Sequence, residues 1–120
     1  MTTELQDKLT EIFPWFHNIY IECGDGWQWI ILDMCREIDD LYFDAGREVD
    51  IEIVQIKEKF GSLRVYYSHT EFNGVFFIDE IIAKYELLSK KTCEFCGKDA
   101  SIINEKGWLR CVCKNCERIW

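Results

Sequence analysis

The sequence has a single proline, two histidines and no long hydrophobic run. Apolar residues make up 48% of its 120 residues and aromatic residues 15%, a composition that excludes disorder and collagen-like repeats. The longest apolar stretches, residues 29–32 and 74–78, are far shorter than the roughly 18 residues that indicate a membrane span. We therefore expect a folded chain with no membrane segment.

Basic residues are also scarce. The chain carries 14 Lys and Arg against 22 Asp and Glu, a formal net charge of -8. A general basic face for nucleic-acid phosphates is therefore not expected, and neither is direct binding of nucleic acid. The charge is uneven, because residues 1–92 sum to -9 and residues 93–120 to +1. We expect an α+β core domain over residues 1–92 and a distinct small unit over residues 93–120.

The sequence also lacks recognisable catalytic motifs and a signal peptide. Neither His17 nor His69 lies in a metal or nucleophile motif, and the sequence contains no Gly-rich phosphate loop or Ser-centred elbow. Residues 1–13 lack the positive start and apolar run of a signal peptide. We expect a protein that is not an enzyme and that works in the cytoplasm.

Helical periodicity predicts three helices. The first begins with a capping-box pattern at Thr3 and Gln6 and ends before Pro14. The second covers residues 27–45, with one apolar stripe and Asp25 as its N-terminal cap. The third runs from about residue 77 to 90. We expect the two longer helices and the short first one to cover a small sheet.

That sheet is predicted from alternation of apolar and polar residues between residues 49 and 67. The pattern breaks around Phe60-Gly61, which predicts an antiparallel hairpin. A doubling at Ile53-Val54 fits either a bulge or burial on both faces. The expected fold class is α+β: a small antiparallel hairpin or sheet packed against helices, with a C-terminal zinc ribbon.

The ribbon is predicted from four cysteines in two Cys-x-x-Cys pairs. Cys93 and Cys96 form the first pair, Cys113 and Cys116 form the second, and 16 residues separate Cys96 from Cys113. This spacing is typical of a four-cysteine zinc ribbon. Four thiolates complete the tetrahedron of Zn²⁺ and leave no position for substrate, so we expect a structural ion. Cys111 leaves one alternative open, because it could replace Cys113 as a ligand.

The order of several segments resembles a family of small uncharacterised proteins of bacteria, phages and prophages. These segments are Ile12–Phe16, Ile21–Trp27, Val54–Tyr66, Cys93–Gly97 and Gly107-Trp108. The most distinctive part is Lys57–Tyr66, of the KEKFGxLRxY type. The chain departs from the family at Ser62, where a second Gly is usual, and at Cys111, where Thr is common. The resemblance implies an intracellular protein of phage or prophage type, and it implies no established activity.

An acidic face is predicted on the second helix. Four carboxylates at spacings of four, three and four residues line up there: Asp33, Glu37, Asp40 and Asp44. Like charges at these spacings destabilise a helix by roughly 0.2–0.5 kcal/mol per pair. We interpret this acidic face as a mimic of nucleic-acid phosphates that binds a basic surface of a host protein. The alternative is a solvated face whose repulsion Arg36 and Arg47 relieve.

The predicted hairpin tip is a second candidate contact surface. It groups three basic side chains around one aromatic residue: Lys57, Lys59, Arg64 and Phe60. The alternative is an exposed turn whose Phe60 packs back onto the core.

These features predict a protein-binding module, a phage-type factor that binds and inhibits or modulates a host protein of defence or nucleic-acid handling. The alternative function is a zinc-ribbon accessory of transcription or nucleic-acid handling. It would contact nucleic acid through the basic residues of the tail, which are Lys98, Lys106, Arg110, Lys114 and Arg118.

Overall fold

The computed structural model describes residues 1–17, 19–68 and 75–117. Three α-helices form within these residues: α1 (Thr3–Ile12), α2 (Gln28–Asp44), which follows the 3₁₀ turn η1 (Asp25–Trp27), and α3 (Val75–Ser89). One sheet has strand order β1-β2-β3, with β1 (Ile21–Glu22), β2 (Glu52–Lys59) and β3 (Ser62–Ser68). A second sheet pairs β4 (Ser101–Glu105) with β5 (Trp108–Val112). The predicted α+β fold is confirmed.

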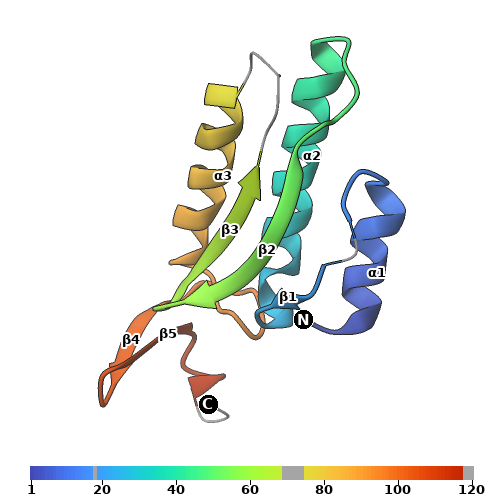
Figure 1. Cartoon of the computed structure of the whole chain (residues 1–120). Coiled ribbons are helices and arrows are strands. Elements are labelled where there is room, and N and C mark those ends of the chain that lie inside the picture. Colours follow the sequence, from blue (N-terminus) through green and yellow to red (C-terminus); the bar gives the residue numbers. More distant parts are fainter. Residues whose placement is uncertain (18, 69–74, 118–120) are drawn as a thin grey trace.

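The three-stranded sheet is covered on one face by α2 and α3, while α1 lies beside β1 (Figure 1). Between these layers lies the core, where the apolar stripe of α2 meets the inward residues of β2 and β3. Its fully buried side chains include Trp27, Ile31, Met34, Ile56 and Leu63. The β4–β5 hairpin extends from the end of the molecule where β2 and β3 turn (Figure 1).

The doubling at Ile53-Val54 is a β-bulge. Ile53 pairs with Tyr67, but Gln55 pairs with the next residue along, Tyr66, so Val54 has no partner of its own. Val54 is 56% exposed, which excludes burial on both faces. Beyond the bulge the alternation resumes, with Ile56 buried and Lys57 on the opposite, open face.

Two expectations about helix caps are wrong. The side chain of Gln6 turns inward, where its Oε1 accepts the backbone N–H of Ile21 at 2.5 Å. Asp25 does not cap α2, since its Oδ1 accepts the backbone N–H of Thr2 at 2.8 Å. Both side chains satisfy backbone donors far away in sequence. These hydrogen bonds hold the N-terminal segment beside β1. Strand β1, which periodicity did not predict, pairs with β2 in parallel.

Both hairpins turn through two residues with positive φ. Phe60 and Gly61 have φ values of 54° and 83°, and Lys106 and Gly107 have values of 54° and 87°. Paired positive φ values are typical of type I′ turns, which match the twist of the flanking strands. A bulky residue rarely adopts this conformation, so the backbone at Phe60 is strained.

The outer edge of β3 is covered by α3. The backbone N–H of Leu63 donates to Oγ of Ser89 at 2.8 Å, and that of Val65 donates to Oε2 of Glu86 at 2.9 Å. Two edge donors are thereby satisfied, which reduces the tendency of the strand to pair with another chain.

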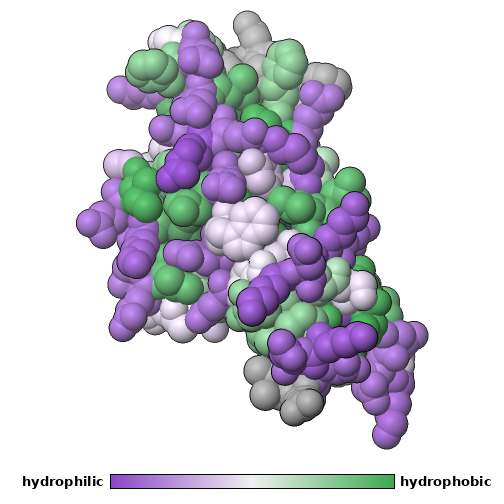
Figure 2. All heavy atoms as spheres, turned by 180° about the vertical axis from the view of Figure 1, so that it is seen from behind, coloured by the Kyte–Doolittle hydropathy of each residue, from purple (hydrophilic) through white to green (hydrophobic). Residues whose placement is uncertain are grey.

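The side of the molecule opposite to that in Figure 1 carries hydrophobic side chains in small patches divided by hydrophilic ones (Figure 2). Among the residues that the structure describes, no helix combines the length and apolar character needed to cross a membrane.

Candidate metal centre

Two loops bring the four cysteines together. The first follows α3, where the N–H of Gly97 donates to the carbonyl oxygen of Cys93 at 3.0 Å and Gly97 has a φ of 80°. The second follows β5, where the N–H of Cys116 donates to the carbonyl oxygen of Cys113 at 3.1 Å. Each loop is a tight turn of the kind that lets two thiols three residues apart face the same point.

The sulfur atoms of Cys93, Cys96, Cys113 and Cys116 all lie within 4.8 Å of one another. Cys96 and Cys113 come from different loops, and their sulfurs are 3.6 Å apart. The four thiols are therefore positioned to hold a metal ion. Their exposure differs, because Cys93 is buried, Cys96 is exposed, and the other two are half-buried.

Cys111 is not part of this cluster. Its side chain is fully buried in the hydrophobic core, and burial raises the pKa of its thiol to about 11. The pKa of Cys113 is instead lowered to about 7, chiefly by the backbone N–H of Cys116. Position therefore makes Cys113, and not Cys111, a member of the group of thiols that could hold a metal ion.

The first cysteine loop packs directly onto the Gly24–Gly26 turn of the core. The N–H of Gly26 donates to the carbonyl oxygen of Glu94 at 2.8 Å. A Cβ at Gly26 would lie 2.3 Å from the carbonyl oxygen of Cys93, and one at Gly24 would lie 2.4 Å from that of Glu94. Neither turn position has space for a side chain, so these two glycines allow the cysteine loop to approach.

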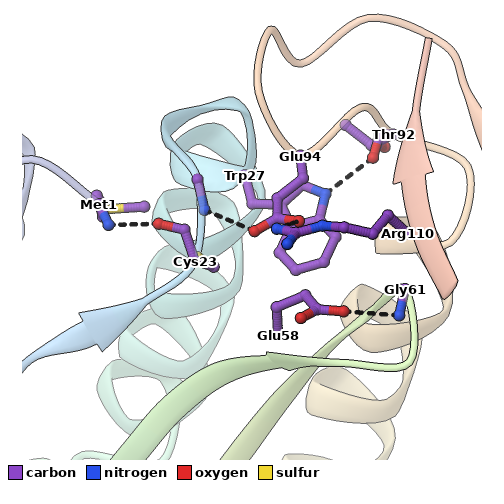
Figure 3. A network of polar contacts seen from close by, with 9 residues as sticks. Met1, Cys23, Trp27, Glu58, Gly61, Thr92, Glu94 and Arg110 are labelled. Atoms are coloured by element: carbon purple, nitrogen blue, oxygen red, sulfur yellow. Dashed lines mark hydrogen bonds and ion pairs between the residues drawn. The ribbon is translucent and has the colours of Figure 1, made fainter. Parts of the chain in front are cut away.

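A buried ion pair completes this contact (Figure 3). Glu94 is 2% exposed, and its Oε1 lies 2.7 Å from a guanidinium nitrogen of Arg110 on β5. Its Oε2 accepts the N–H of Gly24 at 3.0 Å, and the indole N–H of Trp27 donates to the carbonyl oxygen of Thr92 at 2.8 Å. We call this set of five residues the junction: Gly24, Gly26, Trp27, Glu94 and Arg110. It joins both cysteine-bearing segments to the start of α2.

The predicted acidic face is only partly free. Glu37 pairs with Lys84 of α3 at 2.7 Å, and Asp33 lies 3.8 Å from Arg36. Asp40 and Asp44 are exposed near the C-terminal end of α2. The first two carboxylates of the acidic face thus have basic partners within the protein, whereas Asp40 and Asp44 are exposed at the surface.

The hairpin-tip residues lie on the open face of the sheet and at its end. Lys57 is directly opposite Arg64 in the β2–β3 register, and the Nζ of Lys57 lies 5.4 Å from the Tyr66 ring centroid. The Nζ of Lys59 lies 5.7 Å from the centroid of Phe60. Phe60 is 63% exposed, so the alternative that it packs back onto the core is wrong.

A surface hollow of about 260 Å³ lies beside Phe60. Its lining comes from both hairpins: Glu58, Phe60, Gly107, Trp108 and Leu109. Trp108 is 62% exposed. The sequence analysis missed Trp108 as a surface residue, although the position of this Trp directly after the turn residue Gly107 is a signal that could have identified it.

The basic residues of the tail are not equivalent. Lys98, Lys106 and Lys114 are exposed, whereas Arg110 is occupied by Glu94 and lies 5.4 Å from the Phe95 ring centroid. Arg118 lies outside the described residues.

Comparisons of the chain with protein-family models, with curated proteins and with solved structures find no match. The resemblance to the bacterial and phage family therefore stays a prediction.

Proposed function

We propose that this protein is a non-enzymatic protein-binding module held in shape by a structural Zn²⁺. The observation that carries the proposal is the meeting of Phe60 and Trp108, two exposed aromatic residues from different hairpins, at one hollow. Exposed aromatic residues beside a concave surface are typical of protein contact sites, where Trp and Tyr often dominate the binding energy.

The conformation of Phe60 supports this proposal. A Phe with a φ of 54° strains the backbone, yet its ring gains little burial in return. Strained residues of this kind concentrate at binding and active sites. Burial of the ring by a partner would compensate for the strain.

The metal ion would act indirectly. In the part of the chain that the structure describes, four thiols cluster with no fifth ligand group, and such a set favours Zn²⁺, which takes tetrahedral sulfur sites. Zn²⁺ would fix the β4–β5 hairpin between its two cysteine loops, and the junction would fix that hairpin to the core. Trp108 would then be held at a constant position relative to Phe60.

The resemblance adds the setting of an intracellular protein of phage or prophage type. For such a protein we propose that the bound partner is a host protein of defence or nucleic-acid handling, which is inhibited or modulated. Asp40 and Asp44 would supply a second contact if that host protein has a basic surface. This second contact is independent of the hollow and is tested separately.

The experiment is affinity capture from bacterial lysate at moderate salt, with tagged wild-type protein and three sets of variants. We expect Phe60→Ser and Trp108→Ala each to abolish capture of a specific protein, while Phe43→Ala retains it. Phe43 is a matched control because its ring is 81% exposed on α2 and does not line the hollow. Equal capture by Phe60→Ser and by the wild type would contradict the proposal. Loss of capture in Asp40→Lys/Asp44→Lys would add the second contact.

The alternative function, nucleic-acid contact through Lys98, Lys106 and Lys114, makes a different prediction. Binding of nucleic acid would weaken steeply between about 50 and 200 mM salt, by an amount that grows with the number of phosphates contacted. It would also depend on these lysines and not on Phe60.

A further inference from the structure

Three basic side chains share the open face of the β1–β2–β3 sheet. Lys57 and Lys59 lie on β2, and Arg64 lies on β3 with its Nε donating to Oγ of Ser62 at 3.1 Å. Tyr66 lies on the same face, opposite Gln55 and beyond the Lys57–Arg64 pair, and is 41% exposed. We call Lys57, Lys59, Arg64 and Tyr66 the basic sheet face. It stands out in a chain with a net charge of -8.

This arrangement is unfavourable for the isolated fold. Lys57 is directly opposite Arg64, and like charges at such positions destabilise a sheet. On its other side Lys57 is the register neighbour of Glu22 on β1, which offsets part of this repulsion. Within residues 1–17, 19–68 and 75–117, no carboxylate forms an ion pair with Lys57, Lys59 or Arg64. Other basic residues do have carboxylate partners, namely Arg36, Arg47, Lys84 and Arg110. An anionic ligand would remove the repulsion between Lys57 and Arg64.

The surroundings decide which anion fits. The rings of Tyr66 and Phe60 each have a lysine ammonium group over one face, which leaves at most one face of each ring for a stacked nucleic-acid base. Glu22 and Glu52 flank the basic residues on the same sheet. A long polyanion would meet these carboxylates and the negative field of the whole chain. A short acidic peptide segment would avoid both.

The basic sheet face and the hollow approach each other at the hairpin tip, because Lys59 directly precedes Phe60, which lines the hollow. We propose that the basic sheet face binds an acidic segment of the partner protein, whose carboxylates lie over Lys57 and Arg64 and whose adjacent apolar side chain enters the hollow. This inference rests on the proposed protein-binding function and names the chemistry of the partner.

The test is selection of a displayed library of random short peptides on the whole zinc-loaded protein. The selected peptides are expected to be enriched in Asp and Glu next to an aromatic or aliphatic residue. Fluorescence anisotropy of the most enriched peptide then measures its affinity, with single-stranded oligothymidine as a second probe under the same conditions. The peptide should bind more weakly at high salt and more tightly than the oligonucleotide.

The main variant is Lys57→Glu, which places a carboxylate opposite Arg64 and beside Glu22. We expect its melting temperature to stay close to that of the wild type, because the new attraction to Arg64 offsets the new repulsion from Glu22. A thermal melt therefore separates lost binding from unfolding, while the affinity for the peptide falls by about tenfold or more. Lys8→Glu is the matched control, since Lys8 is exposed on α1 and carries the same charge change. It should keep wild-type affinity.

The outcomes separate this inference from the function on which it rests. Selected peptides that need Phe60 and Trp108 but show no acidic excess would overturn the inference and leave the binding module intact. Failure to select any peptide that depends on Phe60 and Trp108 would count against both. Tighter binding of the oligonucleotide than of the peptide would overturn the proposal that the basic sheet face binds an acidic segment. Equal peptide affinity of Lys57→Glu and the wild type would overturn it as well.

Discussion

The backbone N–H of Gly26 donates a 2.8 Å hydrogen bond to the carbonyl oxygen of Glu94. This bond joins the turn before α2 to the loop that carries Cys93 and Cys96, two segments that are far apart in the sequence. Because the approach leaves no room for a side chain at Gly26, the position of the cysteine cluster relative to the core depends on this glycine.

Gly26→Ala is therefore expected to destabilise the protein by about 3 kcal/mol, the upper range for forced overpacking, and to weaken metal binding. Chemical denaturation and a competition titration with a zinc-binding dye measure the two effects. Gly46→Ala is the control, because Gly46 has a φ of 68° and no atom lies within 4 Å of the place that its Cβ would take. It should lose only about 1 kcal/mol through backbone strain and leave the metal affinity unchanged.

The zinc content of cysteine variants should distinguish the four metal ligands from Cys111. Cys96→Ser removes a thiol of the four-cysteine cluster and should bring bound zinc close to zero, with loss of the ordered tail. Cys111→Ser should retain close to one zinc per chain, since Cys111 lies in the core. Elemental analysis after gel filtration provides the measurement, and equal loss in both variants would show that the ligand set is wrong.

The Glu94–Arg110 pair should behave as a buried ion pair. Glu94→Ala and Arg110→Ala are each expected to cost about 3 kcal/mol of unfolding free energy, because each leaves the opposite charge without its partner. The double variant should cost clearly less than the sum. Arg36→Ala serves as the reference, because the ion pair of Arg36 with Asp33 is 3.8 Å long and lies at the surface. This variant should change the free energy of unfolding by at most about 0.5 kcal/mol. Additive losses at Glu94 and Arg110 would contradict a direct interaction.

Ser89→Ala should weaken the edge of the sheet. It removes the acceptor of the buried Leu63 N–H, and an unsatisfied buried donor costs about 1–3 kcal/mol. Faster hydrogen exchange at Leu63 would localise the effect to β3. The exposed Ser101 gives a matched control, and Ser101→Ala should leave both quantities near their wild-type values.

Thiol reactivity should follow burial. Burial raises the pKa of Cys23 to about 12 and that of Cys111 to about 11, and it also raises the pKa of Cys35. In chelator-treated protein at about pH 8, alkylation followed by mass spectrometry should modify the thiols of the four-cysteine cluster and leave Cys23 and Cys35 of the core unmodified. Because the folded-state pKa of Cys111 lies above its ordinary value of 9.0, its contribution to stability is complete below pH 9.0 and declines as the pH rises towards 11. Cys111→Ala should reduce the loss of stability between pH 9.0 and 11. If the variant and the wild type lose the same stability over this range, Cys111 is not the cause of the loss.

The sequence by itself determined the elements whose signals are local. Hydrophobic periodicity located α2, α3 and the β2–β3 hairpin, because a helix or strand with one buried face repeats its apolar residues at a fixed interval. The spacing of the two Cys-x-x-Cys pairs identified the thiols that cluster, because a tight turn fixes where two such side chains point.

Tertiary structure alone decided which distant groups meet. Gln6 and Asp25 match helix-cap patterns, yet both accept hydrogen bonds from backbone groups of other segments. Glu37 belongs to an acidic pattern on α2, but Lys84 of α3 pairs with it. Phe60 and Trp108 come from different hairpins and meet at one hollow, while the Gly24–Gly26 turn and the Glu94–Arg110 pair join the second hairpin to the core. Such contacts depend on how whole elements pack, and a pattern of neighbouring residues carries no information about a partner dozens of positions away.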